Sequence, residues 1–193
     1  VELTSERGAV AEGMLYLAAY VFLLRVPSEC LPAVRGGVGL TARKQRKAVI
    51  SLEGDVVVFS RPHRKNTCYP CRLERKCWCN DDPSTCPLHV LWAFCSTLPV
   101  GTALFGGFSA ASALKCLRVR LAFLGVPSAE LYRTHDFRRG HAQELLARGA
   151  TLREILEAGG RKSLAFLKYL DVVELEREAV VEAHVLESDS DCD

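Results

Sequence analysis

The chain has 193 residues, a formal net charge of +2 at pH 7 and 49% hydrophobic residues. This length and composition predict one sizeable domain with a real core. No apolar run reaches the roughly 20 residues that a membrane span needs, which excludes a membrane-crossing helix, and no secretory signal is found. Because the chain begins at Val1 rather than at Met, we expect it to be a piece of a longer protein.

Charge is distributed unevenly along the chain. Between Arg35 and Lys76 there are eleven Lys and Arg residues but only three acidic ones, whereas residues 171–193 contain nine acidic residues and one arginine. The basic middle predicts a surface that binds a polyanion, and the acidic end predicts a solvated terminus. The last seven residues, ESDSDCD, are expected to have no fixed structure.

The first expected element is a helix over residues 5–24. Ser5 is its candidate cap, and Pro27 ends it because a proline holds the residue before it, Val26, in an extended conformation. The segment SECL then starts a short helical turn before Pro32. Apolar residues at helical spacing predict the buried face of the long helix: Val10, Met14, Leu17 and Val21.

Three strands are expected in the middle of the chain. The runs AVISLEG and DVVVFSRP are rich in β-branched residues and predict a hairpin that turns at Gly54 and Asp55. A second turn follows at HRKN, and the run TCYPCRLERKC predicts a third, irregular strand.

Two helices are expected after these strands. The run PLHVLWAFCSTL predicts the first, and SAASALKCLRVRLAFLG predicts the second. Ser109 is expected to cap the second helix and Gly125 to end it. Its predicted apolar stripe consists of Leu114, Leu117, Leu121 and Leu124.

Three more helices are expected towards the end of the chain. The first covers residues 135–147 and ends at Gly149. Thr151 and Glu154 form a capping box for the next, and Ser163 caps a final one. The predicted fold class is therefore α+β, mainly α-helical, with a small three-stranded antiparallel sheet.

Five of the nine cysteines lie in one segment of the chain, residues 68–86. A domain of this size without a secretory signal favours metal binding in a reducing compartment over a disulfide scaffold. A C-x-C…C-x-x-H spacing suits tetrahedral structural zinc, with one ligand pair in a loop and the other at the start of a helix. Reduced core cysteines are the alternative, and Cys68 and Cys71 are further candidate ligands. The predicted zinc ligands are Cys77, Cys79, Cys86 and His89.

The run YRTHDFRRGHA, residues 132–142, gathers histidines and arginines just ahead of a helix. His135 and Arg138 are three residues apart, so they share one face of that helix. One interpretation is a solvated, basic helix start, and the other is a phosphate-binding site. A tyrosine hydroxyl that cleaves a phosphodiester needs arginines for the non-bridging oxygens, a histidine to move protons and a lysine to protonate the departing 5′ oxygen. Arg25, Lys65 and Tyr169 provide the remaining groups of these kinds.

The segment THDFRRGHAQELLARGATLREILEAGGRKSLAFLKYLD resembles the catalytic core of tyrosine recombinases, in which an H-x-x-R box precedes a tyrosine by about thirty residues. The segment FLLRVPSECLP is similar to the first arginine box of that family. Together with RKN and CWC…CPLH, these motifs resemble the Crypton-type recombinases of eukaryotic mobile elements. The resemblance spans roughly residues 10–175.

The resemblance implies a role for each candidate residue. Arg25 corresponds to the first phosphate-binding arginine, Lys65 to the hairpin lysine that acts as general acid, and His135 with Arg138 to the histidine–arginine pair. Tyr169 corresponds to the nucleophile that forms a 3′-phosphotyrosyl link. Because this link stores the energy for rejoining, neither ATP nor a catalytic metal is required.

At Arg161 the chain departs from the family, which usually has a histidine or tryptophan at this position beside the scissile phosphate. An arginine keeps the ability to hydrogen-bond that phosphate. Two other assignments have alternatives in the sequence itself. Tyr169 taken alone is typical of a half-buried core aromatic, and Lys65 has the cations Arg64 and Lys47 nearby.

The resemblance also implies an organisation and partners. Residues 1–175 form the catalytic domain, with a zinc-binding insertion at 68–89, and residues 176–193 form an acidic C-terminal helix and flexible tail. The expected partners are duplex DNA and further copies of the chain in a tetramer on DNA, without a membrane, in the nucleus. The alternatives are a recombinase fold that binds DNA without cleaving it, which Arg161 favours, and a type IB topoisomerase.

Overall fold

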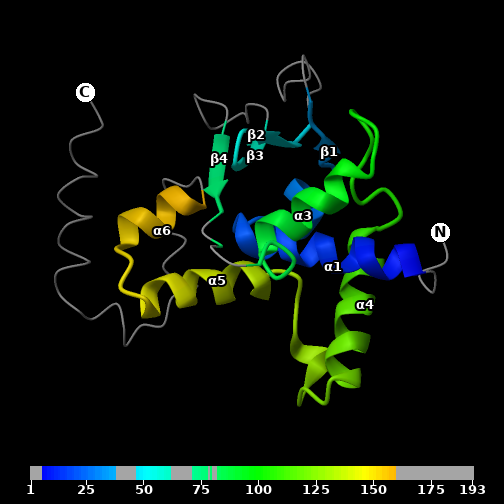
Figure 1. Ribbon diagram of the computed structural model, residues 1–193. Coiled ribbons are helices and arrows are strands. Elements are labelled where there is room, and N and C mark those ends of the chain that lie inside the picture. Colours follow the sequence, from blue (N-terminus) through cyan, green and yellow to red (C-terminus); the bar gives the residue numbers. More distant parts are fainter. Residues whose placement is uncertain (1–5, 38–46, 62–70, 78, 80–81, 160–193) are drawn as a thin grey trace, which may run out of the picture.

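The computed structural model describes residues 6–37, 47–61, 71–77, 79 and 82–159, and these form a mixed α/β structure that is about half helical (Figure 1). One four-stranded sheet, in the order β1-β2-β3-β4, lies along one side. Helices α1 and α3 lie next to it, α5 and α6 lie near β4, and α4 extends away from the sheet. The expected α+β class is thus confirmed in its coarse form, although helix does not dominate as predicted.

Helix α1 (Glu6–Val21) lies at the centre of the core and packs against both α3 (Pro87–Ser96) and α5 (Asp136–Ala147). The predicted buried face holds only in part: Val21 is buried and Met14 and Leu17 pack partly buried against the core, whereas Val10 is 48% exposed. A helix with neighbours on several sides has no single apolar stripe, and small side chains let the neighbouring helices approach. The fully buried positions on and just after the helix are Leu15, Ala18, Ala19 and Phe22.

The chain changes direction sharply after α1. Leu23 has a left-handed φ of +49° and is buried, and Arg25 is extended at φ −85° and ψ 121°. Residues Val26–Cys30 then form a single π-helical turn, η1. The prediction that Pro27 holds Val26 extended is therefore wrong. Val26 and Pro27 begin the turn, where the missing N–H of a proline costs nothing.

The three predicted strands are present, but the sheet contains a fourth. Strands β2 (Val49–Glu53) and β3 (Val56–Arg61) form the expected antiparallel hairpin around Gly54, and β4 (Cys71–Lys76) pairs antiparallel with β3. Strand β1 (Val34–Arg35) pairs parallel to β2, which corrects the prediction of a three-stranded antiparallel sheet.

Long-range hydrogen bonds explain why β1 escaped prediction. The Val34 and Gly36 N–H groups donate to β2 and the residue before it, while the Arg35 N–H donates to Thr102 O at 2.9 Å. A two-residue strand held from both sides by distant segments leaves no periodic pattern in its own sequence.

The remaining described helices begin and end close to the predicted positions. Ser109 and Thr151 each form a capping box, and Gly125 and Gly149 adopt positive φ just after helix ends. The final helix predicted from Ser163 lies outside the described residues. These helices are α4 (Ala110–Phe123), α5 and α6 (Leu152–Ala158), whereas the 3₁₀ turn η2 (Ala129–Leu131) was not predicted.

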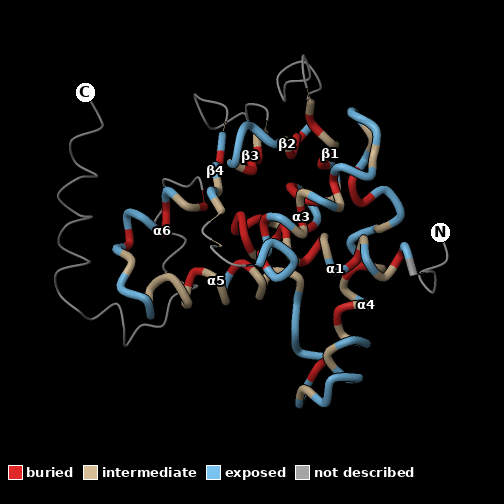
Figure 2. The backbone as a smooth tube through the Cα atoms, viewed as in Figure 1, coloured by how far each residue is buried: buried red, intermediate tan, exposed pale blue. Residues whose placement is uncertain are grey.

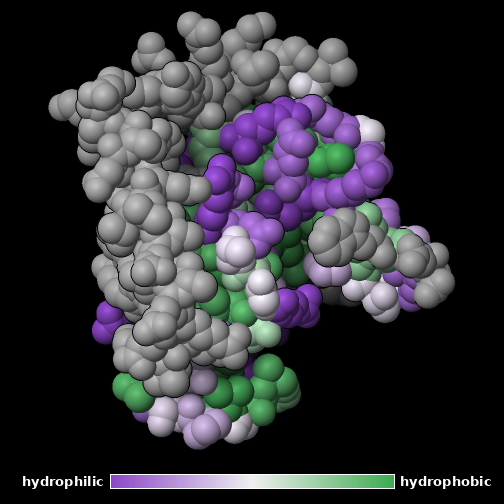
Figure 3. All heavy atoms as spheres, turned by 90° about the vertical axis from the view of Figure 1, so that its left-hand side faces the viewer, coloured by the Kyte–Doolittle hydropathy of each residue, from purple (hydrophilic) through white to green (hydrophobic). Residues whose placement is uncertain are grey.

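Helix α4 and η2 form an arm that leaves the body of the molecule, and most of its outer residues are exposed (Figure 2). The predicted leucine stripe of α4 holds only in part, because Leu117 is buried whereas Leu124 is 72% exposed. Apolar side chains gather at the lower end of the molecule, where this arm ends (Figure 3). Among the described residues, no helix is both long and apolar enough to cross a membrane.

Candidate functional site

The histidine–arginine motif lies at the start of α5. His135 is the residue before the helix, and Arg138 follows one turn later, its N–H donating to His135 O at 3.1 Å. His135 is partly buried, with its Nε2 atom inside the protein. The exposed Arg133 backbone N–H donates to Asp136 Oδ2 at 2.8 Å, which fixes the turn into the helix.

Arg138 has no exposed surface and is the largest fully buried side chain among the described residues. A guanidinium keeps its charge at physiological pH, so its burial requires acceptors or negative potential around it. The C-terminal end of α6 lies beside the guanidinium, since a Cβ added at Gly159 would lie 3.6 Å from Arg138 Nη2. A helix C-terminus carries partial negative charge and therefore supplies such potential. A solvated, basic helix start would leave this side chain in water.

Arg25 is held through its backbone by a buried carboxylate. Its N–H donates to Glu29 Oε2 at 2.7 Å, and Glu29 Oε1 accepts from Arg61 Nη1 at 2.6 Å. Glu29 is only 4% exposed, and Arg61 is the last residue of β3. The Glu29 carboxylate thus connects Arg25 to β3, the strand that precedes Lys65 in the sequence. Sequence reasoning missed both partners, and the only signal was an acidic residue four positions after Arg25 in an otherwise apolar run.

His141 has a structural position on the same helix. Its ring stacks on Tyr20 with centroids 4.5 Å apart, and its Nδ1 forms a hydrogen bond with the Tyr20 carbonyl. Burial, reinforced by Arg75 and Arg148, lowers the pKa of His141 to about 4. The ring is therefore neutral at physiological pH, which suits packing rather than proton transfer.

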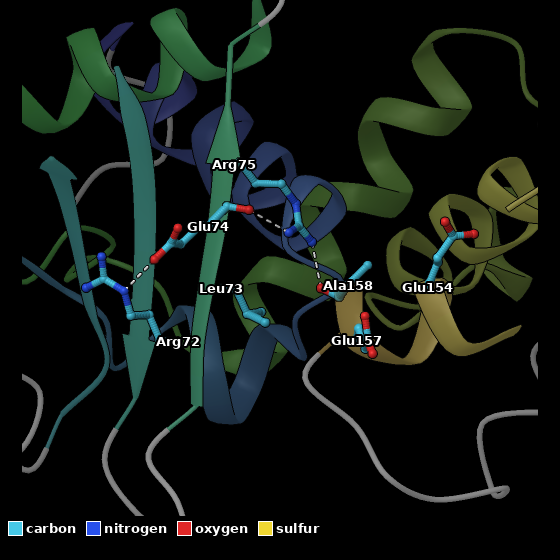
Figure 4. Close-up of a pocket in the computed structure, with 7 residues that line it drawn as sticks. All are labelled: Arg72, Leu73, Glu74, Arg75, Glu154, Glu157 and Ala158. Carbon is cyan, nitrogen blue, oxygen red and sulfur yellow. Dashed lines mark hydrogen bonds and ion pairs between the residues drawn. The ribbon is translucent and has the colours of Figure 1, made fainter. Parts of the chain in front are cut away.

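A pocket of about 400 Å³ lies between β4 and α6 (Figure 4). Its charged groups already have partners, since Arg72 forms ion pairs with Glu53 and Glu74 at 2.7 and 2.6 Å. We assign no chemistry to this pocket. Its lining residues are Arg72, Leu73, Glu74, Arg75, Glu154, Glu157 and Ala158.

A second candidate site is a group of four possible metal ligands, whose ligand atoms all lie within 4.8 Å of one another. The Sγ atom of Cys77 is 3.2 Å from that of Cys86, and the Sγ atom of Cys79 is 3.2 Å from Nδ1 of His89. The first two ligands directly follow β4 and the last two begin α3. The cluster is thus able to bind a metal ion, as predicted, and it joins a strand to a helix.

The thiol of Cys86 ionises more easily than that of an ordinary cysteine. Burial opposes its ionisation, but the backbone N–H of His89, the thiol of Cys77 and the backbone N–H of Leu88 outweigh burial and lower the pKa of Cys86 to about 6. A thiolate at a helix N-terminus is the form that binds metal. Of the two further candidates, Cys71 belongs to β4 and lies outside the cluster, and Cys68 lies outside the described residues.

Three of the six predicted catalytic residues, Arg25, His135 and Arg138, are described by the structure. The other three, Lys65, Arg161 and Tyr169, lie outside the described residues. Comparisons with protein-family models, with curated proteins and with solved structures find no match.

Proposed function

We propose that this chain is the catalytic domain of a tyrosine recombinase, a DNA strand transferase that cleaves and rejoins duplex DNA and serves integration of a mobile element. The observation that carries the proposal is the complete burial of Arg138 one turn after His135. Burial separates this guanidinium from the solvated cations of an ordinary basic surface. In a site of low dielectric constant, such a group stabilises developing negative charge far more than it does in water.

The proposed reaction follows from the chemistry of the residues. The Tyr169 oxygen attacks the scissile phosphorus, the bond to the 5′ oxygen breaks, and Lys65 donates a proton to that leaving oxygen. Arg25 and Arg138 neutralise the non-bridging oxygens. His135 assists the transfer of the proton that the Tyr169 hydroxyl loses as it attacks. The reverse attack, by a 5′-hydroxyl of a partner duplex, releases the tyrosine and completes strand exchange.

Arg161 takes the place where the family has a histidine or tryptophan and donates a hydrogen bond to the phosphate. Exchange between two duplexes requires several active sites, so the proposed active form is a tetramer on DNA, acting in the nucleus.

The test is a nicked suicide substrate, in which loss of a short DNA fragment after cleavage traps the covalent intermediate. The wild-type chain is expected to form a covalent protein–DNA adduct and Tyr169→Phe to form none. Equal absence of adduct from both proteins would refute the enzymatic proposal. A plasmid relaxation assay on the same preparation separates recombination from type IB topoisomerase activity.

A second candidate function is DNA binding without cleavage. Arg161 favours it, because an arginine stands where the family usually has a histidine or tryptophan beside the scissile phosphate. This candidate predicts salt-dependent affinity through the basic stretch between Arg35 and Lys76, and no adduct on the suicide substrate.

We further propose that the four-ligand cluster holds structural zinc through Cys77, Cys79, Cys86 and His89. Tetrahedral zinc with Zn–S bonds of about 2.3 Å places its ligand atoms about 3.8 Å apart, so small movements of the present side chains suffice. Three thiols and one imidazole fill all four positions, which leaves no open position for substrate. The ion stabilises the junction between β4 and α3.

A further inference from the structure

Arg75, on β4, is a partly buried cation that the proposed reaction does not use. Its Nε donates to the Val21 carbonyl at 3.0 Å, and its Nη2 donates to the Ala158 carbonyl at 2.6 Å (Figure 4). A third bond runs from Nη1 to the carbonyl of Glu74 at 2.9 Å. The guanidinium also lies 5.4 Å from the centre of the Phe22 ring. Burial lowers the pKa of Arg75 below its ordinary value, but an arginine stays charged at any physiological pH.

The two distant carbonyls are the ends of two helices. Val21 is the last residue of α1, and Ala158 is the last residue of α6. Carbonyls at helix C-termini lack partners within the helix and carry partial negative charge, so a cation there satisfies both needs. One guanidinium thus caps two helices that are separated by 130 residues or more of sequence. The planar fork of an arginine fixes the directions of both bonds.

Each capped end is close to one of the proposed phosphate-binding arginines, the first in sequence and the second in space. Arg25 follows Val21 by four residues, and Gly159, which adjoins Ala158, lies against the Arg138 guanidinium. The path from Val21 to Arg25 has little freedom. Leu23, with its left-handed φ, is buried in a cluster with Ile155 and other residues of α5 and α6, and the Arg25 N–H is bound to Glu29.

We propose that Arg75 is a positioning residue that sets the relative placement of Arg25 and Arg138. The inference rests on the proposed strand-transfer function. Arg75 holds the two helix ends together: the end of α1 leads to Arg25, and the end of α6 lies against the Arg138 guanidinium, which extends from α5. Since misplacement of reacting groups by about 1 Å costs on the order of 100-fold in rate, a cap of this kind controls the chemical step without contacting DNA.

The experiment compares variants in single-turnover cleavage of the suicide substrate, with protein in excess over DNA. Arg75→Leu removes all donors and keeps an apolar stem, and Arg75→Lys keeps the charge but not the fork. The matched control is Arg148→Leu, because Arg148 is an exposed arginine that pairs with Glu144 on its own helix and lies outside the basic stretch between Arg35 and Lys76. Circular dichroism establishes that each variant is folded at the assay temperature.

We expect Arg75→Leu to form adduct on the order of 10- to 100-fold more slowly than wild type. Arg75→Lys should recover part of the rate, and Arg148→Leu should match wild type. Affinity for DNA, measured in a Tyr169→Phe background, should change by less than about 2-fold because Arg75 contacts no phosphate. Should Arg75→Leu not fold, Arg75→Lys with its intermediate rate carries the same comparison.

A substrate with a neutral methylphosphonate at the cleavage position distinguishes positioning from general damage. It lacks the negative charge that Arg25 and Arg138 neutralise, so the defect of the Arg75 variants should shrink on it by at least about 3-fold. Wild-type rates for Arg75→Leu, or equal slowing on both substrates, would overturn the positioning role while leaving strand transfer intact. Absence of adduct from wild type would instead overturn strand transfer, and the positioning role with it.

Discussion

Removal of the proposed zinc should destabilise the protein by a measurable amount. A ligand that binds only the folded state contributes about 2.7 kcal/mol when its free concentration is 100 times its Kd. For a chain of 193 residues, about 1 kcal/mol shifts the melting temperature by about 2–4 °C. Chelation of zinc should therefore lower the melting temperature by about 5–11 °C, or more if the affinity is higher.

The assay is thermal unfolding followed by circular dichroism, with and without EDTA, together with measurement of zinc content by mass spectrometry. Wild type should contain one equivalent of zinc and respond to the chelator. Cys86→Ser removes a ligand at the start of α3 and should melt at the lower temperature whether or not EDTA is present. Cys71→Ser is the matched control, since Cys71 lies outside the cluster and its variant should respond to EDTA as wild type does.

The reasoning fails if wild type purified in the presence of zinc holds less than half an equivalent, or if EDTA leaves its melting temperature unchanged. Either result would return the cluster to the alternative of reduced cysteines that merely pack together. If EDTA lowers the melting temperature of Cys86→Ser as much as that of wild type, the metal binds elsewhere in the chain.

Three further predictions concern stability alone. Glu29→Ala should cost about 3–5 kcal/mol in urea unfolding, because it leaves Arg61 without its buried carboxylate, whereas Glu53→Ala in an exposed ion pair should cost less than about 1 kcal/mol. His141 has a folded pKa of about 4 against 6.5 when unfolded, so the unfolded chain binds the extra proton and stability should fall as pH falls from 6.5 to 4. Urea midpoints at pH 7 and pH 5 should differ less in His141→Phe than in wild type. Phe123→Ser should change the free energy of unfolding by less than about 0.5 kcal/mol, because the ring is 89% exposed.

Local hydrogen bonds account for what the sequence predicted well. A capping box such as Thr151 with Glu154 is complete within four residues, and a glycine with positive φ is needed wherever a helix ends in the left-handed conformation. The four possible metal ligands were likewise predicted, because they lie within the thirteen residues from Cys77 to His89. In each case the interacting groups are close along the chain.

The features that escaped prediction all join distant segments. Glu29 meets Arg61 across 32 residues, and Arg75 meets Val21 across 54 and Ala158 across 83. No periodicity or spacing in the sequence marks such partners, because their meeting depends on how the helices and the sheet pack. The buried face of α1 was predicted only in part for the same reason, since three neighbouring elements rather than one decide which of its residues are buried.

The burial of Arg138 determines how the two candidate functions can be separated. A module that only binds DNA draws its affinity from exposed cations, and Arg138 adds nothing while it remains buried. A strand transferase gains most from a guanidinium kept out of water until the phosphate arrives. The proposed strand transfer therefore requires groups around Arg138 to move when DNA binds, whereas binding alone requires no such movement.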